Sequence, residues 1–149
     1  MSSDGSRPNF TGIWKMNCEK STLRGPLPKQ ILMKIEHREP VLIQQILFTE
    51  AHGTERRQTF TCQIGAETPN SIGGATLRSC ARWQGMELVI ESRMTTPDRE
   101  SYFKDHWSLS DDGQTLTMAH RDDDLAGQVL VLEKSSQADG STFGKQESG

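Results

Sequence analysis

The chain has 149 residues, the length of one ordinary domain, and 33% of them are hydrophobic while 25% are charged. Its 17 Lys and Arg and 20 Asp and Glu residues are well mixed, and the formal net charge of −3 predicts no basic surface for nucleic acid. No apolar run reaches the length of a membrane span. The polar start contains no secretory signal, which predicts a cytoplasmic protein, although a mature exported fragment without its signal peptide would look the same.

The two ends of the chain differ in composition from its body. Residues 1–8 are polar and are expected to form a flexible lead. Residues 135–149 are mostly Ser, Gly and other polar residues, which bury too little apolar surface to become ordered, so we expect a disordered C-terminal tail. Residues 9–134 are then expected to form a single folded domain.

Between these ends, apolar and polar residues alternate with a period of two, in short segments separated by turn-forming residues. The predicted strands in chain order are Phe10–Cys18, Ile31–Arg38, Leu42–Thr49, Thr54–Ile64, Ala75–Trp83, Met86–Thr96, Glu100–Leu109, Thr115–Arg121 and Gln128–Lys134. Pro69 and Asn70 are interpreted as part of a turn. The link Glu19–Lys29 is rich in Gly and Pro, which disfavours a helix there.

This order of segments predicts an all-β domain. Consecutive short strands with tight turns favour an antiparallel up-and-down meander of about 8–10 strands, closed into a barrel because closure removes the exposed edges. An open sheet or a sandwich is the alternative. A barrel of about eight strands or slightly more has room for one small ligand.

The alternation also assigns the inner face of each strand, and several polar residues fall on it. An apolar core tolerates buried polar groups only when they bond to one another or to water, so these positions predict a cavity. For Arg56, one of these polar residues, the alternative is a register shifted by one residue, with Arg57 facing inward instead. Cys62 faces inward and Cys80 outward, which predicts free thiols. The polar inner residues are His37, Arg56, Gln58, Ser79, Ser92, Asp105 and His120.

Two stretches carry residue identities beyond the alternation. Residues 10–15 read Phe-Thr-Gly-Ile-Trp-Lys, and residues 81–85 read Ala-Arg-Trp-Gln-Gly. The first resembles the opening strand of the calycins, the superfamily of lipocalins and fatty-acid-binding proteins, and the second resembles a hairpin midway through fatty-acid-binding proteins. The resemblance implies that Trp14 closes one end of a calycin-like barrel, that Gly12 permits a bend, and that Lys134 packs on Trp14. The alternative for Lys134 is an ordinary solvated strand end.

The sequence also departs from fatty-acid-binding proteins at two places. The link Glu19–Lys29 is short and Pro-rich where that family inserts a helix-turn-helix lid, so the lid is expected to be absent or reduced. The last strand, Gln128–Lys134, lacks the Arg-x-Tyr pair that holds the ligand's carboxylate in that family. The resemblance therefore implies an interior site and leaves the ligand open.

Three inner residues form a possible chemical site. A His beside a carboxylate is the minimal general-base arrangement, so His37, Asp105 and His120 are candidate catalytic residues; the alternative is that they are buried polar groups that satisfy one another. The 4 histidines have no metal-ligand spacing, and no metal or cofactor is expected. A spatial metal cluster or a haem held by one interior His is the lesser alternative.

Taken together, the sequence predicts a lipocalin-like protein that binds a small, largely apolar ligand in its cavity, and leaves the oligomeric state open. The predicted ligand contacts are Met33, Arg56, Phe60, Phe103, Trp107 and Met118, with Arg56 favouring an anionic group. The alternative is a small barrel enzyme that uses the interior His and Asp residues for proton transfer or addition on a hydrophobic substrate. The residues favour binding over catalysis. A third possibility is a protein-interaction barrel with a filled interior.

Overall fold

The computed structural model describes residues 7–23, 27–122 and 127–135, and all the regular elements in these ranges are strands. The lead and tail predicted from the sequence lie largely outside the described residues. None of the described residues forms a helix long and apolar enough to cross a membrane. The strands are β1 (Gly12–Met16), β2 (Gln30–Arg38), β3 (Val41–Thr49), β4 (Glu55–Gln63), β5 (Glu67–Ile72), β6 (Ala75–Gln84), β7 (Glu87–Thr95), β8 (Glu100–Leu109), β9 (Thr115–Asp122) and β10 (Gly127–Lys134).

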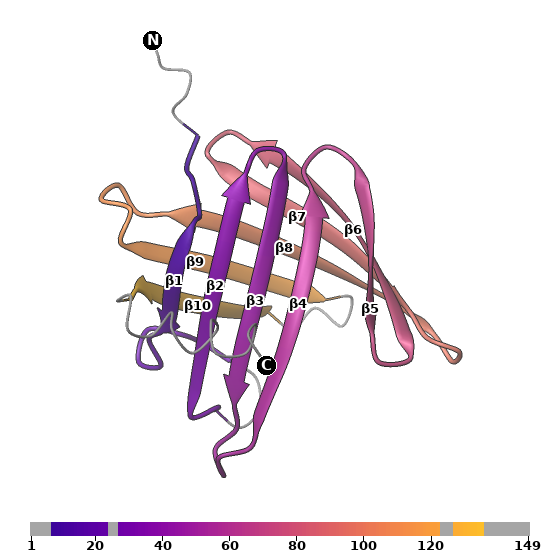
Figure 1. Ribbon diagram of the computed structural model, residues 1–149, viewed down its shortest axis with the longest axis horizontal. Helices are drawn as coiled ribbons and strands as arrows, with labels where there is room; N and C mark the ends of the chain where they lie inside the picture. The colour runs from indigo at the N-terminus through magenta and orange to yellow at the C-terminus, as the bar shows by residue number, and fades with distance from the viewer. Residues whose placement is uncertain (1–6, 24–26, 123–126, 136–149) are drawn as a thin grey trace, which may run out of the picture.

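The strands form one 10-stranded antiparallel sheet in the order β4-β3-β2-β1-β10-β9-β8-β7-β6-β5. Strands that are neighbours in sequence pair with each other, except β4 and β5, and β1 also pairs with β10 through Trp14 and Lys134. Figure 1 shows β2, β3 and β4 crossing over β8, β9 and β10 at a steep angle, as in a barrel rolled from one sheet. The predicted all-β meander, closed into a calycin-like barrel, is confirmed.

One strand was missed by the sequence analysis. Pro69 and Asn70 were interpreted as a turn, but they lie inside β5, which pairs with β6 from Glu67 to Ile72. Proline is tolerated there because β5 is the last strand in the sheet order, and such a strand uses its backbone groups on one side only. Between β4 and β5 no strand ladder forms, so the barrel is nearly closed rather than fully closed.

The two ends of the barrel differ. The turns after β2, β4, β6 and β8 lie at one end, which we call the closed end. The described residues of the link 17–29 and the turns after β3, β5 and β7 lie at the other end, which we call the mouth. At the closed end the Phe10 ring centroid lies 5.6 Å from that of His37 and 5.4 Å from that of Trp107. Trp83 adds a further ring, with its centroid 6.1 Å from Phe10. These packed aromatic rings close this end of the barrel.

Trp14 is fully buried and contacts the residues that the calycin resemblance singled out. Its indole N–H donates to the carbonyl oxygen of Phe10 at 2.9 Å, and the Lys134 ammonium lies 5.5 Å from the ring centroid. Gly12 has a φ of +152°, and a Cβ at this position would lie 3.0 Å from Cε of Lys134. The absence of a side chain at Gly12 therefore allows Lys134 to pack close to the Trp14 ring.

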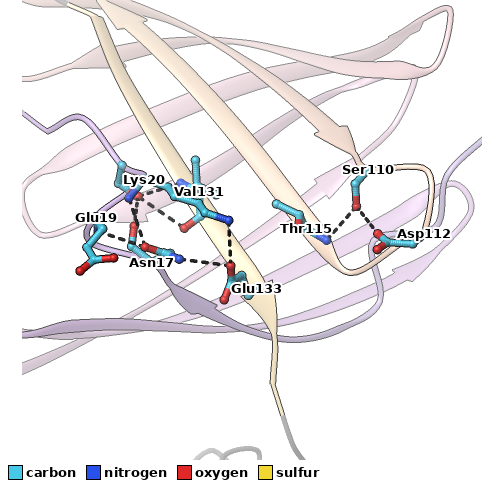
Figure 2. Close-up of polar contacts among 9 residues, drawn as sticks. Asn17, Glu19, Lys20, Ser110, Asp112, Thr115, Val131 and Glu133 are labelled. Carbon is cyan, nitrogen blue, oxygen red and sulfur yellow. Dashed lines mark hydrogen bonds and ion pairs between the residues drawn. The ribbon is translucent and has the colours of Figure 1, made fainter.

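The link between β1 and β2 begins at Asn17, and its residues Asn17 and Thr22 form backbone hydrogen bonds with β10. The Asn17 side chain accepts hydrogen bonds from the backbone N–H groups of Glu19 and Lys20 at 3.0 and 3.1 Å, and donates to Glu133 at 3.1 Å (Figure 2). Further along, the backbones of Thr22 and Val129 exchange two hydrogen bonds. The described part of the link contains no helix, as expected from its sequence.

The turn between β8 and β9 is held by side chains as well as by its backbone. Asp112 accepts a hydrogen bond from the Ser110 hydroxyl at 2.6 Å and one from the backbone N–H of Gln114 at 3.0 Å. Ser110 Oγ in turn accepts from the backbone N–H of Thr115, as Figure 2 shows. The bonds from Ser110 and Gln114 hold the pKa of Asp112 below its ordinary value. The turn fixes the register of β8 and β9, which carry Asp105 and His120.

Candidate ligand-binding cavity

The barrel encloses a cavity of about 570 Å³, a volume in the range of small-molecule pockets. Most of the side chains that line it are apolar and come from the inner positions of β2 to β10. Leu23 and Pro28 of the link also line the cavity, so the link contributes to its wall at the mouth. The apolar lining residues on the strands include Ile31, Met33, Leu42, Ile46, Phe48, Phe60, Ile72, Leu77, Ile90, Met94, Phe103, Trp107, Met118 and Leu130.

Most of the ligand contacts predicted from the sequence lie on this wall. Met33, Phe60, Phe103, Trp107 and Met118 line the cavity. These residues come from β2, β4, β8 and β9, so the predicted contacts are spread around the sheet and do not belong to one hairpin.

Arg56 lies elsewhere. It pairs with Phe48 across β3 and β4, so it is on the inner face as predicted. Its side chain is nevertheless 66% exposed, its guanidinium lies over the Phe48 ring at 5.2 Å, and Glu50 binds it at 3.0 Å. The strand register therefore agrees with the predicted face, but the Arg56 side chain is exposed to solvent near the mouth and does not line the cavity.

Asp105 and His120 are brought together in the cavity wall. They face each other across β8 and β9, and Nδ1 of His120 lies 2.7 Å from Oδ1 of Asp105. Their side chains are 25% and 31% exposed, so the pair is partly accessible. The Phe103 ring lies 5.4 Å from the His120 ring and covers one side of the pair. A carboxylate bound to Nδ1 orients the imidazole, so the pair has the geometry of a base and its positioning group.

His37, the third candidate catalytic residue, does not join this pair. It lies at the closed end, where its Nε2 is 2.8 Å from Oε1 of Glu39 and its Nδ1 accepts the backbone N–H of Phe10 at 3.2 Å. Because Nδ1 accepts, the ring proton is on Nε2 and is donated to Glu39. Oε2 of Glu39 also accepts the indole N–H of Trp83 at 3.1 Å. His37 thus holds the closed end together, which corrects its grouping with Asp105 and His120.

The same contacts shift the titration of Glu39. Partial burial raises the pKa of this carboxyl, but the hydrogen bonds from His37 and Trp83, together with the positive charge of Arg7, outweigh burial. The pKa of Glu39 therefore lies below its ordinary value of 4.5.

Two other polar inner residues predicted from the sequence, Ser79 and Ser92, form a hydrogen bond with each other. The Ser79 and Ser92 hydroxyls lie 2.8 Å apart across β6 and β7, and both are buried. Gln44 donates to the sulfur of Met33 at 3.3 Å. Gln44, Thr61, Asn70 and Gln128 were not singled out from the sequence but line the cavity. Gln128 carried a usable signal, because it shares the inner face of its strand with Leu130 and Leu132.

The three cysteines are free thiols, which confirms the prediction. Cys62 is buried and lines the cavity, whereas Cys18 and Cys80 are exposed. Burial, with a further contribution from Cys80, raises the pKa of the Cys62 thiol. Within the described ranges no group of three or more His, Cys, Asp or Glu side chains is placed to hold a metal ion.

The ten-stranded meander, the buried Trp14 at the closed end and the internal cavity define a calycin-type β-barrel. Several solved β-barrels have a similar fold over most of this chain. An SAHS (secretory abundant heat soluble) protein from Ramazzottius varieornatus matches with a TM-score of 0.66 and 12% identity, over 86% of this chain and 97% of that one. A Schistosoma mansoni fatty-acid-binding protein in complex with arachidonic acid matches with a TM-score of 0.61 and 13% identity, over 89% of this chain and 100% of the other.

The fluorescent protein UnaG is also similar, with a TM-score of 0.59 and 16% identity over 85% of this chain and 97% of that chain. At these identities the similarity establishes the fold alone. No protein-family model and no curated protein sequence matches the chain significantly.

Proposed function

We propose that this protein binds a small, largely apolar molecule inside the barrel. The observation that carries the proposal is the cavity of about 570 Å³, with its mainly apolar wall and a few polar groups. Transfer of an apolar molecule from water into such a space is favourable, and the few polar groups orient it. Among the solved barrels of this fold are fatty-acid-binding proteins, one of them in complex with arachidonic acid, which supports the same use of the interior here.

The composition of the wall favours an adaptable pocket. Met33, Met94 and Met118 all line the cavity, and methionine side chains adjust to ligands of different shape because they are unbranched and polarizable. Phe60, Phe103 and Trp107 supply large aromatic surfaces between them.

Two variants on one strand provide a matched test. Ile46 lines the cavity, whereas Ile43 lies on the opposite face of β3. Ile46→Trp fills the cavity and is expected to weaken binding of an uncharged, environment-sensitive fluorescent dye by about tenfold or more, while Ile43→Trp leaves the affinity unchanged. Native mass spectrometry of freshly purified protein looks for a ligand that co-purifies. A native protein that binds neither dye nor ligand, or equal dye affinities in the two variants, contradicts the proposal.

A second candidate function rests on one observation, the 2.7 Å contact between His120 and Asp105 in the cavity wall. In this alternative His120 acts as a general base on a small hydrophobic substrate, and Asp105 orients it. The test is turnover of an activated hydrophobic ester. Catalysis is supported if this turnover is lost in His120→Gln and retained in His37→Gln, while the affinity for the dye is unchanged. Equal rates in the two variants remove His120 from that role.

A further inference from the structure

Asp105 places a carboxylate inside a mainly apolar cavity. It is the one Asp or Glu among the described residues of the wall, and none of those described residues is Lys or Arg. The site therefore has an acidic residue and a histidine as its ionisable polar groups, apart from the thiol of Cys62. This charge pattern limits which head group a ligand can carry.

The contacts of Asp105 show what it offers to a ligand. Its Oδ1 is bonded to Nδ1 of His120 at 2.7 Å. In the described part of the chain no hydrogen bond or ion pair is made to Oδ2, and the side chain remains 25% exposed. A carboxylate oxygen is only an acceptor, so Oδ2 can take a hydrogen bond from a hydroxyl or an ammonium group.

With the carboxylate ionised, the Asp105–His120 pair carries a net charge of either −1 or 0, depending on whether the imidazole is neutral or protonated. In neither state is the pair net positive. A ligand carboxylate beside it would add a second carboxylate charge in a mainly apolar space, to which the described wall contributes no Lys or Arg. A hydroxyl or ammonium head group instead donates a hydrogen bond that Oδ2 accepts.

The cation at the mouth does not reverse this balance. Arg56 is bound by Glu50 at 3.0 Å, and its side chain is 66% exposed. An anionic head group that approached Arg56 would have to displace Glu50 and compete with water.

We infer that the cavity selects an apolar molecule with a hydrogen-bond-donating head group, a hydroxyl or an amine, and discriminates against a carboxylate. This inference rests on the proposed binding function and names the ligand class for the same cavity. Oδ2 of Asp105 accepts a hydrogen bond from the head group, and His120 holds Asp105 in position.

A ligand series of constant chain length tests the inference on the native protein. Dodecanol, dodecylamine and dodecanoate are used to displace an uncharged environment-sensitive dye, each below its micelle concentration. Dodecanol and dodecylamine are expected to compete at concentrations about tenfold or more below that of dodecanoate, the usual effect of a hydrogen bond to a charged group. Dodecanoate that competes as well as dodecanol overturns the inference but leaves the proposed function intact. Failure of the dye and of all three compounds to bind contradicts the proposed function itself.

Two variants attribute the selectivity to its residue. Asp105→Asn retains the shape and removes the charge, so the difference between dodecylamine and dodecanoate is expected to fall to about threefold or less. Asp98→Asn removes the same charge from the exposed turn between β7 and β8 and is expected to leave the selectivity of the native protein. Selectivity that persists in Asp105→Asn, or is lost equally in Asp98→Asn, overturns the role given to Asp105. The native ligand series decides the ligand class even if Asp105→Asn fails to fold.

Discussion

The side-chain amide of Asn70 forms the pair of hydrogen bonds with the backbone of Thr61 that a neighbouring strand would form. Its Nδ2 donates to the Thr61 carbonyl at 2.9 Å, and its Oδ1 accepts the Thr61 N–H at 3.0 Å. Two residues earlier, Thr68 Oγ1 accepts the N–H of Gln63 at 2.9 Å. Side chains from β5 thus bridge the one place where the barrel has no strand ladder.

Replacement of Asn70 tests this bridge. Asn70→Ala leaves the Thr61 backbone groups to water and is expected to lower the free energy of unfolding by about 1–2 kcal/mol, since each such bond contributes roughly 1 kcal/mol net. Hydrogen exchange of the Thr61 amide, followed by NMR, should become faster. Asn70→Asp is the matched control, because it retains the acceptor for that amide, although it replaces the donor to the Thr61 carbonyl by a charged acceptor. An exchange rate that is unchanged in Asn70→Ala would show that the bridge does not protect this edge.

The closed end should lose stability in acid through Glu39. The pKa of this carboxyl is lowered in the folded protein, so the unfolded chain binds more protons in the interval between the two pKa values. Its contribution is therefore complete above the ordinary value of 4.5 and is lost as pH falls through the lower, folded value. In Glu39→Gln, the urea midpoint should lie below that of the native protein at neutral pH, and the two should converge in acid.

Trp83→Phe gives the intermediate case for the same experiment. It retains an aromatic ring at the closed end and removes only the indole donor to Glu39. Its acid dependence should lie between those of the native protein and Glu39→Gln. A constant difference between native protein and Glu39→Gln at every pH would assign the effect to packing instead of ionisation.

The three thiols should react at different rates. Cys62 is buried and its pKa is raised, so less of the reactive thiolate is present at neutral pH, whereas Cys18 and Cys80 are exposed. Intact-mass analysis during treatment with iodoacetamide should show two additions before the third. In denaturing urea the three rates should become similar, and Cys62→Ser should remove the slow step. A single fast phase in the folded protein would contradict the burial of Cys62.

The boundaries of the folded domain give another prediction. We propose the domain as 9–134 from sequence, but Arg7 lies 5.4 Å from the Trp83 ring centroid and the Ser135 N–H donates to the Ile13 carbonyl at 2.7 Å. A chain of residues 7–135 should therefore be more stable than one of residues 9–134, by about 1–2 kcal/mol for one cation–π contact and one hydrogen bond. Chemical denaturation of both chains measures the difference, and equal midpoints would show that neither contact matters.

Much of the barrel could be predicted because the alternation of apolar and polar residues with a period of two shows directly on which face of a strand each side chain lies. The strand Glu100–Leu109 was predicted with its observed bounds, and the inward position of Asp105 followed from Phe103, Trp107 and Leu109 on the same face. The strand β5 could not be predicted in this way, since Pro69 and Asn70 carry the chemistry of a turn. Only the tertiary placement at the end of the sheet makes a strand of them.

The site was predicted less completely, because the face on which a side chain lies does not determine which other inner side chains it contacts. Asp105 and His120 are brought together by the register of β8 with β9, which the alternation alone leaves open. His37 also faces inward but binds Glu39, which lies in the turn directly after its own strand. For Arg56 the pattern gives the correct face and no information on how far a long side chain extends toward solvent.

The aromatic rings at the closed end also have a kinetic consequence. Because Phe10, His37, Trp83 and Trp107 pack against one another there, a molecule held in the cavity enters and leaves by the mouth or past the side-chain bridge between β4 and β5. For the binding function proposed above, the lifetime of a complex is then expected to depend on how often the side chains at the mouth or that bridge move aside, and the affinity on the cavity wall. Changes at Thr22 or Asn70 can therefore alter the association and dissociation rates together, at a nearly constant dissociation constant.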